Sequence, residues 1–342
     1  MINIGVIGCG KIAQVRHLPE YADNADCRIV ALYDLNLERA KQLAKKYGAE
    51  ACASYEELLA RKDIDAVSIC TANASHAEIT IAALKAGKHV LCEKPMATTI
   101  EECESMVNAA KESGRFLMIG HNQRLAKGHA MARRLIEDGA IGKILTFKTS
   151  FGHCGPETWT IDAKNNWFFD KNLAVFGALA DLGIHKTDLI QFLTGEKVVE
   201  VTAYIGTLDK KDKNGSLIGV DDNAICIYRM SNGAVGTMTA SWTYYGSEDN
   251  STVLYGTEGI MYIYTNPDFS VIVEKRSGEK IYYSLDQIQT NDNQTKSGVI
   301  DLWIQCLKNN TPPEISGEDA LYSMRAVFAA LKSAMEGKTI KI

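Results

Sequence analysis

One segment near the middle of the chain carries residue types suited to proton transfer. Asp181, His185 and Asp188 follow one another at positions i, i+4 and i+7. On an α-helix this spacing puts the three on one face, so Asp181 and His185 can point together into a pocket. Histidine titrates near neutral pH, which suits a general acid or base. The alternative is structural: a stabilising aspartate at a helix N-terminus and a histidine packed against a sheet.

A second reactive group lies in Glu93-Lys94-Pro95, directly after an apolar run over 89–92. If that run is a strand of an open α/β sheet, Lys94 stands at its carboxyl end, where such sheets bind ligands. An ammonium placed there can stabilise negative charge that develops during a reaction. Pro95 restricts the local backbone and makes the Lys94–Pro95 bond a candidate for the cis form. An ordinary solvated surface lysine is the alternative.

The start of the chain carries a glycine motif. Gly8-Cys9-Gly10-Lys11-Ile12-Ala13 fits G-x-G-x-x-[G/A], between an apolar strand-like run and a helical pattern. The glycines permit a tight turn and close approach of a pyrophosphate, which would lie against the N-terminus of the following helix. A strand–helix turn that binds no cofactor is the alternative.

Asp34 favours a dinucleotide. It ends the second apolar run, 26 positions after Gly8, where an acid can accept hydrogen bonds from ribose hydroxyls. A 2′-phosphate beside Asp34 would meet like-charge repulsion, and the nearest basic candidate is Arg39. We therefore predict NAD in preference to NADP, bound through Gly8, Gly10, Lys11, Ile12 and Asp34.

Short apolar runs alternate with helical patterns through the first third of the chain. Strands are expected over 3–7, 28–33, 66–70, 89–92 and 116–119, and helices over 12–22, 37–47, 55–60, 77–86 and 100–112. This alternation predicts a doubly wound parallel sheet of the Rossmann type, covered on both faces, over residues 1–120.

The pattern changes after residue 120. Helices are expected over 128–138, 180–193, 299–308 and 319–336, and strands over 199–206, 224–230, 234–242, 252–255, 261–264 and 271–274. Short turns between these strands predict an α+β domain over 121–342, with a largely antiparallel open sheet. The last helix is a candidate to pack back on the first domain. An exposed sheet face of this kind commonly pairs with a copy of itself, so a homodimer or homotetramer is expected.

Composition excludes several classes of partner. The chain has 342 residues, a net charge of −5 and no basic stripe interleaved with aromatics, so nucleic acid is not expected. No apolar run reaches the length of a membrane span, and residues 1–5 lead into a strand rather than an export signal. The nine cysteines show no Cys-x-x-Cys pair or zinc spacing, which predicts no metal site and a reducing cytoplasm.

Four motifs in order give the chain a family resemblance: Gly8-x-Gly10-x-x-Ala13, Thr71-x-Asn73-x-x-His76, Glu93-Lys94-Pro95 and Asp181-x-x-x-His185. With them the sequence resembles the glucose–fructose oxidoreductase/inositol dehydrogenase (Gfo/Idh/MocA) family of NAD(P)-dependent oxidoreductases, over nearly the whole chain. The resemblance implies hydride transfer between nicotinamide and a secondary alcohol or ketone of a cyclic polyol, sugar or sugar derivative.

The resemblance also implies site residues. Lys94, Asp181 and His185 would form the catalytic group: His185 as the base, Lys94 on the reacting oxygen, and Asp181 on a neighbouring hydroxyl or orienting the base. The implied cofactor contacts are Thr71, Asn73, His76, Glu93 and Lys94. Gln123, Arg124 and Trp167, with Asp181 and His185, would line the substrate site. For Arg124 an interdomain ion pair is the alternative.

The sequence departs from the family pattern near the expected pocket. Phe168 stands where many relatives have an arginine, and Val175-Phe176-Gly177 replaces a common run of three glycines. These aromatics could stack on a sugar ring or simply pack in the core. Two other functions keep the same fold: a glycosidase that transiently oxidises its sugar with bound NAD, and a dinucleotide sensor without catalysis.

Overall fold

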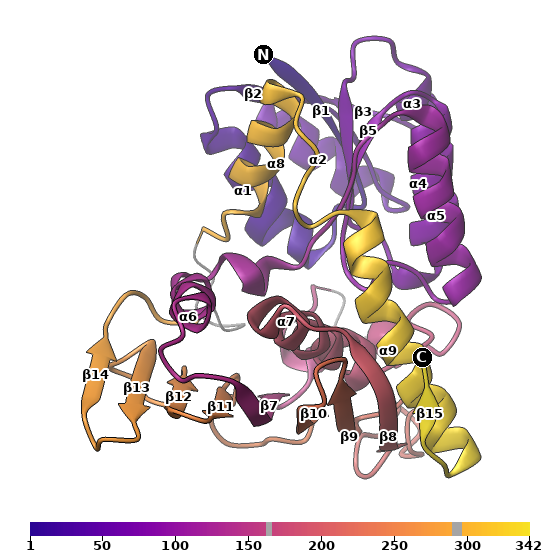
Figure 1. The fold of residues 1–342 in the computed structure, drawn as a ribbon. Helices are drawn as coiled ribbons and strands as arrows, with labels where there is room; N and C mark the ends of the chain where they lie inside the picture. Colours follow the sequence, from indigo (N-terminus) through magenta and orange to yellow (C-terminus); the bar gives the residue numbers. More distant parts are fainter. Residues whose placement is uncertain (162–165, 289–295) are drawn as a thin grey trace.

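The N-terminal third folds around a parallel sheet. In the computed structural model, which describes residues 1–161, 166–288 and 296–342, six strands pair in the order β3-β2-β1-β4-β5-β6 (Figure 1). Their bounds are β1 Ile2–Ile7, β2 Cys27–Tyr33, β3 Glu50–Ala51, β4 Ala66–Ile69, β5 His89–Cys92 and β6 Leu117–Ile119. The strand order reverses beside β1, which creates the crevice where doubly wound sheets bind ligands. The predicted Rossmann architecture is confirmed.

Helices follow these strands and cover the sheet. They are α1 Leu18–Asp23, preceded by a π-helical turn over Ala13–His17, then α2 Leu37–Tyr47, α3 Tyr55–Ala60, α4 His76–Lys85 and α5 Ile100–Ser113. Local sequence sets several of their ends. Thr99 and Glu102 form a capping box at the start of α5, and Gly114 ends that helix in the left-handed conformation.

The second sheet is mixed and mostly antiparallel. The described residues give it nine strands in the order β14-β13-β12-β11-β7-β10-β9-β8-β15, of which only β7 and β10 run parallel. The bounds are β7 Ile144–Gly152, β8 Val198–Gly206, β9 Asn223–Met230, β10 Val235–Ser241, β11 Thr252–Gly256, β12 Gly259–Ile263, β13 Val271–Lys275, β14 Lys280–Tyr283 and β15 Ile340–Lys341. Strand β7, which the sequence patterns did not suggest, lies at the centre, between β10 and β11.

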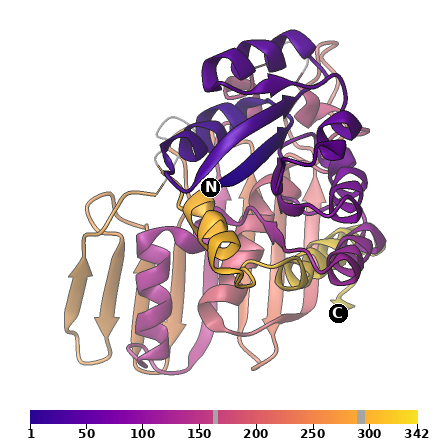
Figure 2. The same ribbon diagram turned by 90° about the horizontal axis from the view of Figure 1, so that it is seen from above.

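One face of the second sheet packs against helices that lie between the two sheets (Figure 1). These are α6 Lys127–Glu137, α7 Ile184–Thr194 and α9 Gly317–Glu336. Figure 2 shows the N-terminal sheet lying over part of the second sheet, with β13 and β14 extending to one side. Helices α6, α7 and α9 therefore lie between the two sheets (Figure 1), where their residues can contact both halves of the molecule.

Two C-terminal helices return to the N-terminal half. The side chains of α8 (Val299–Asn309) join the core under β1 and β2, with Trp303 fully buried there. Helix α9 packs on both α5 and β8, and Arg325 on it pairs with Glu104 of α5. The C-terminal segment thus ties the two halves together. Among the described residues, no helix is both long and apolar enough to cross a membrane.

Candidate functional site

A cavity of about 1410 Å³ lies between the two halves of the molecule. Most of the predicted site residues line it: Gly8, Gly10, Lys11, Ile12, Asp34, Thr71, Asn73, Glu93, Lys94, Gln123, Trp167, Asp181 and His185. Its lining joins the carboxyl ends of the parallel strands to residues of the second half. Two predicted residues, His76 and Arg124, are buried beside the cavity rather than in its lining.

The glycine loop has the geometry of a pyrophosphate cradle. Gly8 has φ of +93°, and a Cβ there would lie 2.6 Å from the carbonyl carbon and oxygen of Cys70. A Cβ on Gly10 would meet no atom within 4 Å, so the loop is open to the cavity at that position. Glycine at position 8 is required by the fold, whereas glycine at position 10 leaves space for a ligand. The loop fits a dinucleotide.

Asp34 stands beside this loop. Its Oδ2 accepts the backbone N–H of Cys9 at 2.7 Å, and its Oδ1 accepts that of Asn36 at 2.8 Å. The Nη1 of Arg39 lies 3.6 Å from Asp34 Oδ1. The carboxylate therefore holds the loop in place, and because Asp34 also lines the cavity, ribose hydroxyls bound there can donate to it.

Lys94 and Asp181 meet across the cavity although 87 positions separate them. The Nζ of Lys94 donates to Asp181 Oδ1 at 2.8 Å and to the Asp181 carbonyl at 3.0 Å. Asp181 lies in a π-helical turn, Leu179–Gly183, that leads into α7. Burial by itself would raise the pKa of this carboxyl, but Lys94 lowers it below its ordinary value, so Asp181 is an anion at neutral pH.

Buried residues of the first half hold the turn that carries Lys94. The Lys94–Pro95 peptide bond is cis, and His76 Nδ1 lies 2.8 Å from the Pro95 carbonyl. Glu93 is buried against His17, with Nε2 and Oε1 2.9 Å apart. Burial opposes ionisation of Glu93, yet His17 and the neighbouring positive charges lower its pKa to about 2. His76 and Glu93 thus hold the turn that carries Lys94.

His185 sits at the start of α7 and lines the same cavity. It is 7% exposed, its ring packs against Phe151, and no described residue bonds its buried Nδ1. Burial first, and then the positive charge of Lys94, hold the pKa of His185 well below its ordinary value. The imidazole is neutral at pH 7 and can accept a proton.

A further histidine, His153, lines the cavity and was not predicted as a site residue. Its Nδ1 accepts the backbone N–H of Gly155 at 2.9 Å, so the proton of the neutral ring is on Nε2. Phe151 packs against both His153 and His185. Local sequence patterns did not indicate this role, because His153 follows β7, a strand that those patterns did not predict.

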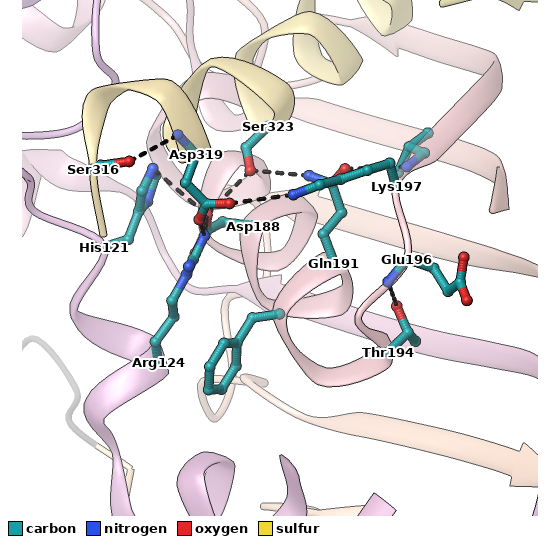
Figure 3. A network of polar contacts seen from close by, with 12 residues as sticks. His121, Arg124, Asp188, Gln191, Thr194, Glu196, Lys197, Ser316, Asp319 and Ser323 are labelled. Carbon is teal, nitrogen blue, oxygen red and sulfur yellow. Dashed lines mark hydrogen bonds and ion pairs between the residues drawn. The ribbon is translucent and has the colours of Figure 1, made fainter. Parts of the chain in front are cut away.

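Arg124 forms ion pairs, as the structural alternative for this residue supposed, but both partners lie in the second half of the chain rather than across the domain boundary. Its Nε donates to Asp188 Oδ2 at 2.7 Å, and its Nη2 lies 2.5 Å from Asp319 Oδ2 (Figure 3). Asp188 belongs to α7 and Asp319 to α9, so Arg124 connects the segment after β6 to both helices. With its Nε and Nη2 engaged and its side chain buried, Arg124 is placed to hold α7 rather than to bind substrate.

Aromatic rings form one wall of the cavity. Trp167 and Phe168 stack with ring centroids 4.0 Å apart, and both line the cavity. Phe176 also lines it while packing edge-on against Phe328. These rings therefore pack against other aromatic rings and also face the cavity, and their stacking on a sugar ring stays a prediction.

The run that replaces three glycines is strained at one position. Val175 has φ of +67°, a region that β-branched residues rarely adopt. Gly177 is required, because a Cβ there would lie 1.6 Å from the Asp221 carbonyl oxygen. The Asp221 carboxylate also accepts the N–H groups of Gly177 and Leu179 and so anchors the turn that carries Asp181.

Comparisons with known proteins decide the family. Residues 2–121 match the model described as "Oxidoreductase family, NAD-binding Rossmann fold", and residues 129–262 match the "GFO/IDH/MocA C-terminal domain". The chain belongs to the Gfo/Idh/MocA family. It is an NAD-binding oxidoreductase, as the cradle of Gly8, Gly10 and Asp34 indicates. Among the described residues, no cluster of three or more His, Cys, Asp or Glu could hold a metal ion.

Relatives within the family are sugar and polyol enzymes by name. The chain is 33% identical over 296 residues to levoglucosan dehydrogenase of Pseudarthrobacter phenanthrenivorans, covering 78% of this chain and 75% of that protein. It is 26% identical to myo-inositol 2-dehydrogenase of Thermotoga maritima over 100% of this chain and 98% of that one. A solved structure of levoglucosan dehydrogenase with NADH and levoglucosan superposes with a TM-score of 0.87 at 26% identity, covering 100% and 99%.

Replacing Asp34 with alanine is expected to weaken NAD binding about tenfold or more, because hydrogen bonds to a charged acceptor are lost. The preference for NAD over NADP should fall at the same time, since the repulsion of a 2′-phosphate is removed. Titration of intrinsic fluorescence with each cofactor measures both effects. Glu38→Ala, at a nearby exposed acid in α2, is the control. Unchanged NAD affinity in Asp34→Ala would exclude Asp34 from the ribose site.

Proposed function

We propose that this family member transfers hydride between NAD(H) and a secondary alcohol or ketone of a cyclic polyol, sugar or sugar derivative. The observation that carries the proposal is the convergence of Lys94, Asp181 and His185 on the cavity that also contains the glycine loop. When bound, NAD supplies the hydride acceptor or donor. All other steps fall to residues of this chain.

Lys94 is proposed to bind the reacting oxygen. A lysine ammonium has three N–H donors, and two of them point to Asp181. No described residue bonds the third donor, which can meet the substrate oxygen and stabilise the negative charge that develops on it. Because Asp181 holds the ammonium at two points, the third N–H has a fixed direction, which is what catalysis by orientation requires.

His185 is proposed as the general base for alcohol oxidation and as the acid for ketone reduction. Its low pKa keeps it neutral before it takes the hydroxyl proton. Asp181 was expected to bind a hydroxyl or to orient this base. Its hydrogen bonds instead go to Lys94 and to the indole of Trp242, so we assign it the role of holding Lys94.

The substrate class rests on the relatives and on the shape of the site. Named relatives act on levoglucosan, inositols and other sugar derivatives. In this chain the aromatic wall of Trp167 and Phe168 offers flat apolar surface of the kind that packs against the C–H face of a sugar ring. Gln123, whose Nε2 donates to Asn250 at 3.1 Å, adds polar groups to the same lining.

The test is a panel of inositols, hexoses, anhydrosugars and 1,2-diols with NAD⁺, followed by the absorbance of NADH. Turnover on at least one cyclic polyol or sugar is expected. Cleavage of a glycoside by purified protein, without net NADH formation, would instead establish the glycosidase alternative. NAD binding with no reaction across the panel would support the sensor.

We further propose the division into domains at residues 120 and 121, with α9 packing back on the first domain, and a cytoplasmic location. The first sheet ends with β6 at Ile119, which supports the boundary, and the contact of α9 with α5 supports the packing.

The state of the cysteines supports the cytoplasmic location. All nine lie within the described residues, and all are free, as a reducing compartment favours.

A homo-oligomer through the second sheet is proposed from the face opposite the helices. Three exposed residues on β8 and β9 are apolar: Tyr204 is 68% exposed, Ile225 54% and Ile227 48%. Tyr204 pairs with Ile225 across the strands, so these side chains form one continuous patch. Exposed apolar patches of this kind commonly mark protein interfaces.

Ile227→Glu is expected to dissociate the oligomer, because a charge at the centre of an apolar interface would lose its hydration. Sedimentation velocity at micromolar protein should show a shift toward monomer. Met335→Glu adds the same charge at an exposed position on α9, which covers the other face, and should leave assembly unchanged. Wild-type protein that already sediments as a monomer would contradict the proposal.

A further inference from the structure

Trp242 contacts the catalytic group without lining the cavity. It follows β10, is fully buried, and its Nε1–H donates to Asp181 Oδ2 at 3.1 Å. Its own backbone N–H donates to the Asp222 carbonyl at 2.8 Å. A residue of the second sheet therefore reaches the carboxylate that holds Lys94.

Both oxygens of the Asp181 carboxylate are thus occupied by different partners. Oδ1 accepts from Lys94 and Oδ2 from Trp242. Rotation of the carboxylate would break both hydrogen bonds, so its plane is fixed. A carboxylate without the indole donor could turn, and the ammonium of Lys94 would turn with it.

The indole is itself held in place. Phe168 packs edge-on against the Trp242 ring with centroids 6.3 Å apart, and Phe169 lies at 6.0 Å from it. Phe168 also lines the cavity through its stack with Trp167. A continuous set of contacts therefore runs from the aromatic wall through Trp242 and Asp181 to Lys94.

We propose that Trp242 is a positioning residue, which fixes the direction of the Lys94 ammonium by holding the second oxygen of Asp181. This rests on the proposed function of Lys94 and Asp181. Trp242 contacts Asp181 and does not line the cavity. Its effect on catalysis is therefore proposed to pass through the Asp181 carboxylate.

The first variant is Trp242→Phe, which keeps an aromatic ring in the core and removes the N–H. Its kcat/KM is expected to fall about tenfold or more, as for loss of a hydrogen bond to a charged group, while NAD affinity is unchanged. Trp303→Phe is the matched control. Trp303 is equally buried, in α8, and no described residue bonds its indole Nε1. The control loses similar volume and should retain kcat/KM.

A double-mutant cycle separates positioning from packing. In an Asp181→Ala background, Trp242→Phe should cost less than about twofold, because the acceptor of its hydrogen bond is already gone. An equal loss in both backgrounds, or no loss from Trp242→Phe alone, would overturn the proposal. If Asp181→Ala itself retains full activity, the failure lies instead in the proposed function of the Lys94–Asp181 pair.

Two further readouts remain decisive if Trp242→Phe folds poorly. Trp242→His keeps a ring N–H donor and should retain more kcat than Trp242→Phe at equal or lower thermal stability. The acidic limb of the kcat/KM profile, which His185 sets, depends on the charge of Lys94 nearby, so an ammonium that is able to turn should shift that limb. A His variant no better than the Phe variant, with an unshifted limb, would assign Trp242 to packing alone.

Discussion

Lys94→Met is expected to lower kcat by about 10²–10³-fold, the usual loss when a preorganised donor to a developing oxyanion is removed. Methionine keeps the length and apolar stem of the lysine but provides no N–H group. Asp181 is then left without the cation that stabilises it. Steady-state turnover on the substrate found by the panel measures the loss, and substrate affinity should change much less than kcat.

Lys94→Met is expected to lower turnover without a comparable loss of NAD binding. NAD binding to Lys94→Met, measured by fluorescence titration, is expected to stay within a few-fold of wild type, since Gly8 and Asp34 are untouched. Lys85→Met, at an exposed position on α4, is the control for loss of one positive charge and should keep full turnover. A Lys94 variant that loses NAD binding in proportion to kcat would place this lysine with the cofactor only.

His185→Ala is expected to lower kcat by about 10²–10⁴-fold, the range that general acid–base catalysis contributes. The alanine variant loses the only proposed proton acceptor at the reacting hydroxyl, while the Lys94–Asp181 pair remains. His89→Ala, at the opposite end of β5 from the cavity, tests for a general effect of removing an imidazole. Equal losses in the two variants would show that His185 acts through stability rather than proton transfer.

The pH dependence of wild-type alcohol oxidation follows from the same histidine. The reaction requires neutral His185, so kcat/KM falls as the pH drops through its pKa. Burial and the charge of Lys94 depress that pKa, which puts the acidic limb below the ordinary histidine value of about 6.5. In Lys94→Met one depressing charge is gone, so the limb for residual activity should move to higher pH. A limb that stays in place would mean that another group titrates there.

Local signals were sufficient for the cofactor half. The glycine loop and Asp34 lie within one strand–helix–strand unit, where each residue's role is set by neighbours close in sequence. The parallel sheet and the antiparallel character of the second sheet followed from the periodicity of apolar residues in the same way. The central strand β7 was not predicted, because its place in the sheet depends on pairing with β10 and β11, which lie far along the chain.

Residue types and their spacing were enough to predict a Rossmann half, its NAD cradle and, through four motifs, the family. What the polar residues contact became clear from the packing of the fold. Asp181 holds Lys94 rather than His185, Arg124 pairs with Asp188 and Asp319, and Trp242 and His153 join the site. The physical reason is that these contacts join residues from different elements. A side chain's type and spacing limit what it can bind, but its partner is chosen by how helices and sheets pack.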